Sequence, residues 1–376
     1  MTRKKIASIE IKKQNRTNIY RLLHRSGGMT KQDIVSSLQL SLPTVTQNIN
    51  ELQKEGLVEE SGSMGNTGGR RAKTYDIIKN ARVAVGLDIT RNHITVVVVD
   101  LKGEVILRTG VRHPFERTDE YYRFLGALVD QAVQKCGLAP DKVLGVGIGI
   151  PGLVTPDHQK VFYGKILNFT GATCEEFSTY INYPSSLFND ANAAGFAESW
   201  FSNRTKNFFY LMLSNNIGGS VVINGEVYNG DHLHSGEIGH LCIVPNGRKC
   251  YCGQRGCVDA YLAATELSSL TDGNIGNYFA LLKSGNKEAK AVWEQYLQHL
   301  ALAVNNLYML FDCTVILGGY VGSYIEEYLP TVRSYAAELN TFENGDASYI
   351  EVCSYKTEAI AAGAALNYIS AFIDSI

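Results

Sequence analysis

The sequence predicts an α/β protein with a separate basic module at its N-terminus, and three observations support this. Residues 81–150 have the pattern of strands, then a helix, then a strand. The same order of strands returns after residue 208. Residues 1–80 carry 14 Lys+Arg against 7 Asp+Glu, whereas the rest of the chain carries 21 against 30. A basic head on an acidic body indicates a nucleic-acid-binding module joined to a domain of another kind.

Composition excludes several classes of protein. The 376 residues suffice for two or three domains, and contents of 45% hydrophobic and 19% charged residues are typical of a soluble globular protein. No run of 18 apolar residues exists, so we expect no membrane partner. The N-terminus has no apolar segment of the secretory kind, which predicts a cytoplasmic protein.

The head begins with two predicted helices. Apolar residues at helical spacing, Ile19, Leu22 and Leu23, predict a helix over residues 15–23, which Gly27 and Gly28 end. Thr30 then stands at the N-cap of a second helix, with Asp33 in the position that a capping box uses.

A third helix is expected from about residue 42 to 55. Its buried side is predicted to consist of Leu42, Val45, Ile49 and Leu52. Its outward side chains are short and polar, which suits hydrogen bonding to base edges in a major groove. These candidate DNA-binding residues are Thr44, Thr46, Gln47, Asn48 and Asn50.

Two short strands over residues 56–60 and 72–75 are expected after the helices. The glycine-rich loop between them ends in Arg70 and Arg71, which are predicted to enter a minor groove or hold phosphate. Together these elements predict a winged helix-turn-helix that binds operator DNA. The alternative is an ordinary three-helix bundle with a polar face.

The body is predicted to alternate strands and helices. Expected strands cover residues 81–89, 94–100, 104–109, 143–150, 208–213, 220–223, 226–228 and 314–317. Expected helices lie near residues 121–132, 296–308 and 358–371, the last returning to pack on the first part of the body.

One His and three Cys predict a metal site. His240, Cys250, Cys252 and Cys257 offer four ligands of the kind that tetrahedral zinc prefers. Four protein ligands leave no open position, so the predicted cofactor is structural Zn²⁺. The alternatives are four unconnected residues or a disulfide framework, and nothing else in the sequence indicates an oxidising compartment.

The motif G-E-x-G-H at residues 236–240, followed by C-x-C-G-x-x-G-C at residues 250–257, resembles the signature of the ROK family. That family contains sugar kinases and sugar-responsive repressors. The resemblance implies a two-lobed ribonuclease H-like domain, as in the actin, heat-shock chaperone ATPase and sugar kinase superfamily. It also implies that Glu237 and His240 contact sugar hydroxyls between the lobes, with His240 on zinc as well.

Further sugar contacts are expected at the ends of two strands. Gly152 follows a buried strand in a turn where a ligand can approach the backbone. The resemblance makes Asp190 the family's aspartate that accepts a proton from a sugar hydroxyl, with Asn189 beside it; by propensity alone Asp190 could be only an N-cap. Asp259 stands where the family usually has Glu, and we expect it to contact the sugar too.

Both phosphate loops of the family's kinases are altered. Residues after Asp88 lack the two glycines and the lysine of D-x-G-G-T-K, and residues 214–220 keep two of five key glycines. Glycine backbone N–H groups are what such loops use to hold phosphate. We therefore predict no catalytic residues and no kinase activity.

The sequence thus predicts a sugar-responsive transcriptional regulator, a repressor of carbohydrate-utilisation genes with a small-molecule sugar as its effector. Its domains are predicted as residues 1–80, residues 81–190 with 358–376, and residues 191–357. Symmetric operators and the family predict a homodimer or homotetramer. The alternatives are an ATP-dependent sugar kinase that keeps a DNA-binding head, and a repressor controlled by a protein partner.

Overall fold

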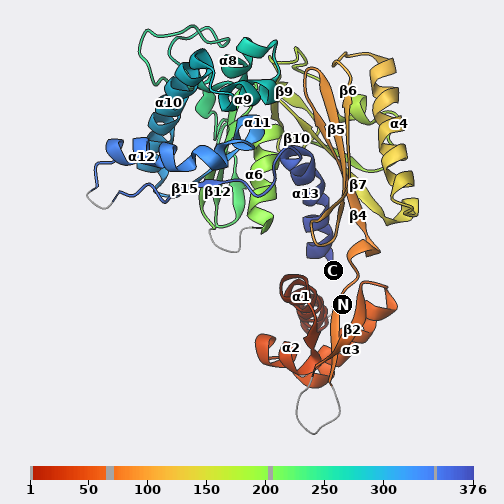
Figure 1. Ribbon diagram of the computed structural model, residues 1–376. Coiled ribbons are helices and arrows are strands. Elements are labelled where there is room, and N and C mark those ends of the chain that lie inside the picture. The colour runs from red at the N-terminus through yellow and green to blue at the C-terminus, as the bar shows by residue number, and fades with distance from the viewer. Residues whose placement is uncertain (1–2, 65–71, 202–205, 343–344) are drawn as a thin grey trace.

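The computed structural model describes residues 3–64, 72–201, 206–342 and 345–376. A small head formed by the N-terminal elements lies below a larger body that contains two sheets (Figure 1). The last helix of the chain ends next to the head, close to the N-terminus (Figure 1). Within the described ranges, no helix combines the length and apolar character that crossing a bilayer requires.

The head has the predicted winged helix-turn-helix order. Its elements are α1 (Arg3–Ser26), β1 (Met29–Thr30), α2 (Lys31–Leu38), α3 (Leu42–Lys54), β2 (Val58–Met64) and β3 (Ala72–Ile77). The sheet has the order β1-β3-β2, and side chains from all three helices are fully buried between them, among them Ile19, Ile34 and Val45. The capping box at Thr30 and Asp33 is confirmed. The first helix is longer than predicted.

Two residues of α3 face differently from the prediction. Asn48 is 2% exposed, and its Nδ2 donates to the Thr44 carbonyl oxygen at 2.8 Å, so the expectation that it lies on the outward face is wrong. The reason is helical geometry, since residue 48 lies three positions after Val45 and four before Leu52, both in the core. Leu42, expected inside, is 48% exposed because it is the first residue of the helix and extends beyond the core.

The first sheet of the body has the order β10-β7-β4-β5-β6. Its strands are β4 (Val83–Ile89), β5 (His93–Asp100), β6 (Val105–Arg112), β7 (Val143–Ile150) and β10 (Ser185–Asn189). The first three pair antiparallel, whereas β7 and β10 run parallel to β4. Every residue of β4 is buried, as its unbroken apolar pattern requires, and α4 (Asp119–Lys135) packs beside β5.

The second sheet repeats this topology as β13-β12-β11-β14-β15. Its strands are β11 (Phe208–Leu213), β12 (Ile217–Ile223), β13 (Glu226–Tyr228), β14 (Thr314–Gly318) and β15 (Ile350–Val352). Three antiparallel strands are again followed by two strands parallel to the first. The predicted internal duplication and the α/β fold class are therefore confirmed. β12 begins three residues earlier than predicted, so part of the altered phosphate loop is strand.

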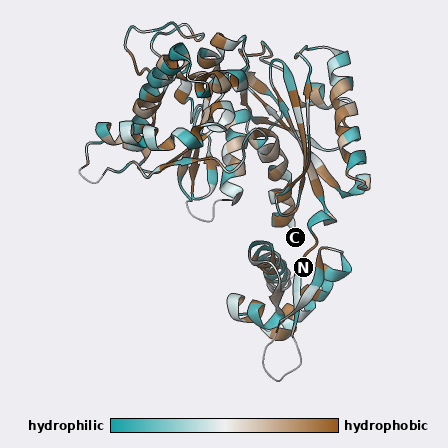
Figure 2. Cartoon of the chain, viewed as in Figure 1, coloured by the Kyte–Doolittle hydropathy of each residue, from teal (hydrophilic) through white to brown (hydrophobic). Residues whose placement is uncertain are grey.

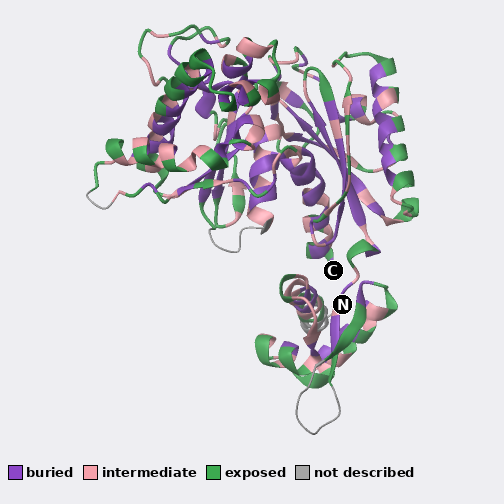
Figure 3. Cartoon of the chain, in the orientation of Figure 1, coloured by how far each residue is buried: buried purple, intermediate pink, exposed green. Residues whose placement is uncertain are grey.

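Two helices fill the centre of the body, α6 (Asp190–Phe201) and α13 (Ala359–Ser375), and both are largely buried (Figure 3). They pack on each other, and α13 also covers β4, β5 and β7, as predicted for the last helix. The contact with α6 is close enough to require glycine, since a Cβ at Gly363 would lie 1.7 Å from the Ala193 carbonyl oxygen. Hydrophobic residues concentrate in these helices and in both sheets (Figure 2).

The remaining elements join the head to the body, complete the first lobe or cover the second sheet. They are β8 (Leu153–Val154), β9 (Val161–Tyr163), α5 (Cys174–Ser178), α7 (Asp259–Leu262), α8 (Ala264–Ser268), α9 (Ile275–Lys283), α10 (Lys287–Phe311), α11 (Gly319–Gly322), α12 (Leu329–Leu339) and the 3₁₀ helices η1 (Lys79–Ala81), η2 (Pro140–Lys142), η3 (Ile238–His240), η4 (Ser269–Thr271) and η5 (Ile325–Tyr328). The segment between β13 and α7 holds the four predicted metal ligands.

Candidate functional site

A pocket opens where two parallel strands of the first sheet end. β7 ends at Ile150 and is followed by Gly152, while β10 ends at Asn189. Carboxyl ends of parallel strands meet at one edge of a sheet, which is where ligands bind in α/β proteins. Gly152, Asn189 and Asp190 line this pocket, as predicted from the motifs.

Asn189 caps α6, and this leaves Asp190 for another role. The Asn189 Oδ1 accepts a hydrogen bond from the Asn192 backbone N–H at 2.9 Å, and its Nδ2 donates to the Gly152 carbonyl oxygen at 3.1 Å. The first bond is the usual N-cap interaction, with the cap at Asn189. Asp190 is the first residue of the helix, and its Oδ1 accepts from the Ala191 N–H at 2.8 Å. Capping therefore does not explain the aspartate.

A buried carboxyl group, Asp88, and a half-buried one, Asp190, lie at the bottom of the interlobe region. Burial raises the pKa of Asp190 to about 7, and the charge of Glu237 adds to this rise. Asp88, near the end of β4, is 4% exposed; burial first, and then the charge of Asp190, raise its pKa to about 7. Each carboxyl group thus exchanges its proton near neutral pH, where an ordinary aspartate is fully ionised.

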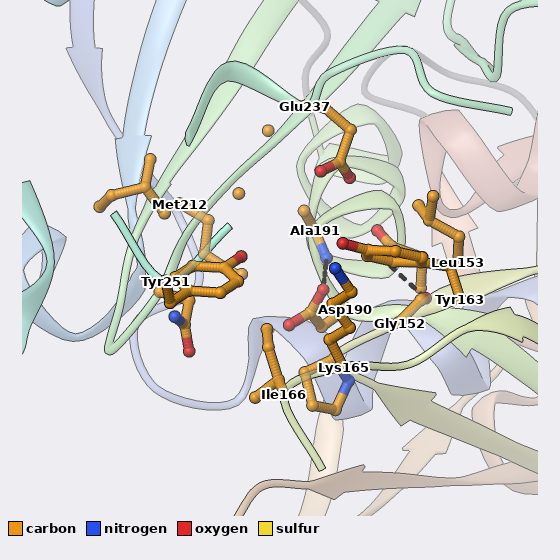
Figure 4. Close-up of a pocket in the computed structure, with 16 residues that line it drawn as sticks. Gly152, Leu153, Tyr163, Lys165, Ile166, Asp190, Ala191, Met212, Glu237 and Tyr251 are labelled. Carbon is orange, nitrogen blue, oxygen red and sulfur yellow. Dashed lines mark hydrogen bonds between the residues drawn. The ribbon is translucent and has the colours of Figure 1, made fainter. Parts of the chain in front are cut away.

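The opposite wall of the pocket comes from the second lobe. Glu237 and Asp190 face the same space, with Tyr251 on one side of it and Tyr163 on the other (Figure 4). A Glu237 carboxylate oxygen lies 3.8 Å from the His240 Nε2. Burial raises the pKa of Glu237, and the imidazoles of His240 and His234 oppose this rise. The two lobes therefore present carboxyl groups to one cavity, an arrangement that can accept several hydrogen bonds from a polyol.

The four predicted metal ligands meet behind this wall. The ligand atoms of His240, Cys250, Cys252 and Cys257 all lie within 4.8 Å of one another. His240 uses its two ring nitrogens in different directions: Nδ1 lies 3.9 Å from the Cys250 Sγ, and Nε2 lies 3.3 Å from the Tyr251 hydroxyl. One nitrogen thus faces the cluster and the other faces the pocket. This donor set could hold a metal ion.

Asp259, predicted as a further sugar contact, lies beside the pocket and not in its wall. It is buried, its Oδ1 accepts from the Ile217 N–H at 2.7 Å, and it lines a neighbouring cleft instead of the pocket. Asp259 is the first residue of α7, and its bond to Ile217 connects this helix to the start of β12. Asp259 therefore fixes the start of β12 and lines the cleft beside the pocket, which Asp190 also lines.

Sequence reasoning missed several residues that line the pocket. Tyr163 ends β9 and Lys165 follows it, and the Lys165 ammonium lies 5.5 Å from the centre of the Tyr163 ring. Tyr251 lies between two metal ligands in sequence, and only the folded module brings its ring to the pocket. The sole signal for Tyr251 was its place inside the cysteine motif; nothing in the sequence marked Tyr163 or Lys165.

The far end of α6 contacts the head. The Trp200 Nε1 donates to the Lys102 carbonyl oxygen at 3.2 Å, and its ring meets His24 edge-on at 5.4 Å between centroids. The Lys102 ammonium donates to the carbonyl oxygens of Leu23 and His24 in the last turn of α1, at 3.3 and 2.9 Å. His24 in turn lies 2.7 Å from the Leu101 carbonyl oxygen through its Nε2. One helix therefore connects the pocket to the first helix of the head.

The exposed face of α3 keeps four of the five predicted polar residues. Gln47 and Asn50 are exposed, Thr44 and Thr46 are half-buried, and Asn48 points inward. The Gln47 Nε2 donates to the Glu51 carboxylate at 3.1 Å. Arg70 and Arg71, predicted at the tip of the wing, lie outside the described residues.

Known proteins are similar to this chain in sequence. The chain matches the ROK family over residues 84–369 and a winged helix-turn-helix DNA-binding family over residues 13–59. It is 30% identical to the xylose repressor of Bacillus spizizenii over 261 residues, 68% of this chain and 67% of that protein. It is 24% identical to the DNA-binding transcriptional dual regulator NagC of Escherichia coli over 353 residues, 88% of this chain and 86% of that protein.

Solved structures have the same fold. A ROK family transcriptional regulator, a homolog of the E. coli MLC protein, superposes with a TM-score of 0.75 at 23% identity and covers 97% of both chains. A ROK family glucokinase from Streptomyces griseus, in complex with glucose and AMPPNP, gives 0.64 at 22% identity and covers 76% of this chain and 98% of its own. The two-lobed domain of this protein therefore has the sugar kinase fold. With its family match spanning most of the sequence, the chain belongs to the ROK family.

Proposed function

We propose that this protein is a sugar-responsive DNA-binding repressor of carbohydrate-utilisation genes. The observation that carries the proposal is the path of α6, which begins at Asp190 in the interlobe pocket and contacts His24 of the head through Trp200. A xylose repressor and a DNA-binding transcriptional dual regulator among the relatives support it. A ligand that moves the first turn of α6 would thus move the contact that positions the DNA-binding head.

The sugar would bind between the lobes. Asp190 and Glu237 would accept hydrogen bonds from its hydroxyls, and the backbone at Gly152 would approach its ring. The Nε2 of His240 would face the ligand beside Glu237. Asn189 would orient the wall through its bonds to Gly152 and α6, and Asp259 would act from behind the β11–β12 turn. Carboxylates, an amide and an imidazole together recognise hydroxyl groups without requiring a charged ligand.

The metal cluster would hold structural zinc. One His and three Cys fit Zn²⁺, and four protein ligands would close its coordination shell. The bound ion would fix the loop that carries Glu237 and Tyr251, and it would orient the His240 ring with Nε2 toward the pocket. His240 therefore serves the fold with one nitrogen and the ligand with the other.

The protein is proposed to lack kinase activity. The turn after β4 contains no glycine, and the two glycines kept after residue 216 lie in β12, where packing accounts for them. A Cβ at Gly219 would lie 2.4 Å from the Phe209 ring, and one at Gly218 would lie 3.0 Å from the Ala191 Cβ. Glycine at these positions thus needs no phosphate to explain it.

Sugar binding would lower DNA affinity by favouring one arrangement of the lobes. A ligand shifts such an equilibrium only through its different affinities for the two states, and typical couplings are about 1–3 kcal/mol. Thr44, Thr46, Gln47 and Asn50 would read base edges, and Arg70 and Arg71 would hold the backbone or minor groove. We propose a cytoplasmic homodimer or homotetramer with domains at residues 1–80, 81–190 with 358–376, and 191–357.

Fluorescence anisotropy with promoter DNA from beside the gene tests the function. We expect specific binding that one sugar weakens in the absence of ATP, and Gln47→Ala should weaken binding by about tenfold, the loss of one good base contact. If the protein instead consumes ATP in the presence of a sugar, and no sugar changes its DNA binding, the assigned function would be that of a sugar kinase. If a partner protein releases the DNA and no sugar does, DNA binding would be controlled by that partner.

A further inference from the structure

The cavity next to the sugar pocket is larger than the pocket and continuous with it. The pocket has a volume of about 50 Å³, whereas the neighbouring cleft has about 480 Å³. Small-molecule sites usually measure about 300–1,000 Å³, so the cleft by itself can hold a sugar-sized group. Residues that line both cavities are Pro151, Ile166, Asp190, Met212, Asn216 and Tyr251.

The cleft lacks the backbone of a phosphate-binding loop, since the turn after β4 that lines it contains no glycine. Among the described residues that line it, carboxyl groups outnumber cations: Asp88, Asp190, Asp259 and Glu266 against Arg91 and Lys249. The Arg91 Nη2 already donates to the Ile166 carbonyl oxygen at 2.5 Å. Glu266 is paired with Arg248 at 2.7 Å, and Asp88 and Asp190 are partly protonated at neutral pH, so the charges that line the cleft nearly balance. The missing glycine nest is therefore what makes the cleft a poor site for a triphosphate.

The cleft is instead lined by groups that bind neutral hydroxyls. Three amide side chains, Asn92, Asn215 and Asn216, each offer both a donor and an acceptor, and Thr265 adds a hydroxyl. Tyr251 separates the two cavities, and Tyr320 reaches across from the second lobe, where its hydroxyl bonds with Thr90 of the first. These groups come from both lobes, so a ligand that spans them would tie the lobes together.

From this geometry we propose that the effector is a glycoside of at least two units, such as a disaccharide. One sugar unit lies at Asp190 and Tyr251, where the pocket joins the cleft, because the pocket alone, at about 50 Å³, is too small for a sugar ring. The unit attached to it extends into the part of the cleft that Asn92, Asn215 and Thr265 line. The proposal rests on the sugar-responsive function proposed above and specifies the class of its ligand. It also gives the cleft a role that needs no phosphate.

Calorimetry on the full-length protein tests the proposal. The ligands are xylose, glucose, N-acetylglucosamine, their β1,4-linked disaccharides, their 6- or 5-phosphates and ATP. We expect a disaccharide to bind at least tenfold more tightly than its monosaccharide. Equal affinities, or tighter binding of a sugar phosphate or ATP, would overturn the proposal while leaving a sugar sensor intact. If no sugar binds, the proposed sugar-responsive function itself is contradicted.

A substitution in the cleft provides the second readout. Thr265 is exposed, and no other side chain of the pocket depends on it, so Thr265→Trp should fill the cleft without affecting folding. We expect it to weaken disaccharide binding at least tenfold and to change monosaccharide binding less than twofold. The matched control is Thr179→Trp, at an exposed site after α5 and outside both cavities, which should change neither affinity. An equal loss for both ligands, or for neither, would contradict the extended site.

Discussion

The two lobes repeat one sheet topology but differ in what is attached to it. The residue before the last of β4 in the first lobe is Asp88, and the matching residue of β11 in the second lobe is Met212. Both side chains are 4% exposed, but only the first is a carboxyl group. The helix after the fifth strand begins with Asp190 in the first lobe and with Ala359 in the second. The second lobe alone carries the His/Cys segment. The two lobes therefore share a backbone topology, whereas a few side chains and one inserted segment provide the groups that can bind a ligand or a metal.

Substitution of a metal ligand should have the largest effect on stability, and it should destabilise the second lobe first. We expect Cys252→Ser to reduce bound zinc from about one ion per chain to nearly none. Losing a structural metal costs more than about 4 kcal/mol, and domains of this size lose about 2–4 °C per kcal/mol, so the melting temperature should fall by about 10 °C or more. Metal analysis and hydrogen exchange would check this, with β11–β15 losing protection before β4–β7.

Cys242→Ser is the control for the metal prediction, because Cys242 lies in the same segment but is exposed and outside the cluster. It should leave the metal content unchanged. Full zinc occupancy in Cys252→Ser would refute the four-ligand site.

The second prediction contrasts Asp88 with Met212 through pH. The native pKa of Asp88, about 7, lies above its ordinary value of 3.8, so the folded protein holds a proton that the unfolded chain releases. This contribution to stability is complete below pH 3.8 and is lost as the pH rises through 7. Asp88→Asn should therefore match the parent at pH 4 and exceed its free energy of unfolding at pH 8 by up to about 4 kcal/mol.

Denaturant unfolding at the two pH values would measure the Asp88 effect. Asp190, Tyr121 and Tyr320 are titratable groups that interact with Asp88, and all three remain in the variant. Met212→Leu, at the matching position, should change stability equally at both pH values. A gain for Asp88→Asn that does not depend on pH would contradict the assignment.

The third prediction compares the first residues of α6 and α13. Asp190→Ala, which copies the start of α13, should weaken sugar binding by about 30-fold, because a hydrogen bond to a charged group contributes about 2 kcal/mol. Calorimetry with the effector sugar measures it. Asp130→Ala, at an exposed position of α4, should bind sugar as the parent does. Unchanged affinity in Asp190→Ala would exclude the pocket as the sugar site.

The last prediction has the smallest expected effect. It compares two contacts, one from α6 and one from α13, through which sugar binding could change the position of the head. Trp200→Phe removes the hydrogen bond from α6 to Lys102 and should reduce the sugar-induced change in DNA affinity about fivefold, or about 1 kcal/mol. The route from α13 is the ion pair of Arg21 with Asp374, at 2.5 Å and with side chains 40% and 57% exposed. Exposed pairs contribute little, so Asp374→Ala should change the response less than twofold.

Anisotropy titrations with and without sugar measure both variants, and sugar affinity should stay within twofold of the parent in each. Equal responses in Trp200→Phe and the parent would mean that α6 does not transmit the signal.

Much of this protein was readable from its sequence, because the informative features are local. The capping box at Thr30, the strands of both sheets and the spacing of His240 with three cysteines each depend on neighbours within a few dozen residues. A glycine at a strand end likewise indicated Gly152, whereas the resemblance to the ROK family was needed to indicate Asn189 and Asp190, and all three line the pocket. The polar side chain of Asn48, however, led to the wrong face, although its spacing from Val45 and Leu52 places it on the buried side of α3.

Only the tertiary structure decided which distant residues meet. Tyr163 and Lys165 line the pocket because a small sheet brings them there, and Asp259 is excluded from it because it holds the start of β12. The path along α6 from Asp190 to Trp200 and His24 depends on how the head packs against the body. Side-chain patterns repeat along a chain and therefore mark local elements, whereas contacts between lobes depend on packing that no local pattern encodes.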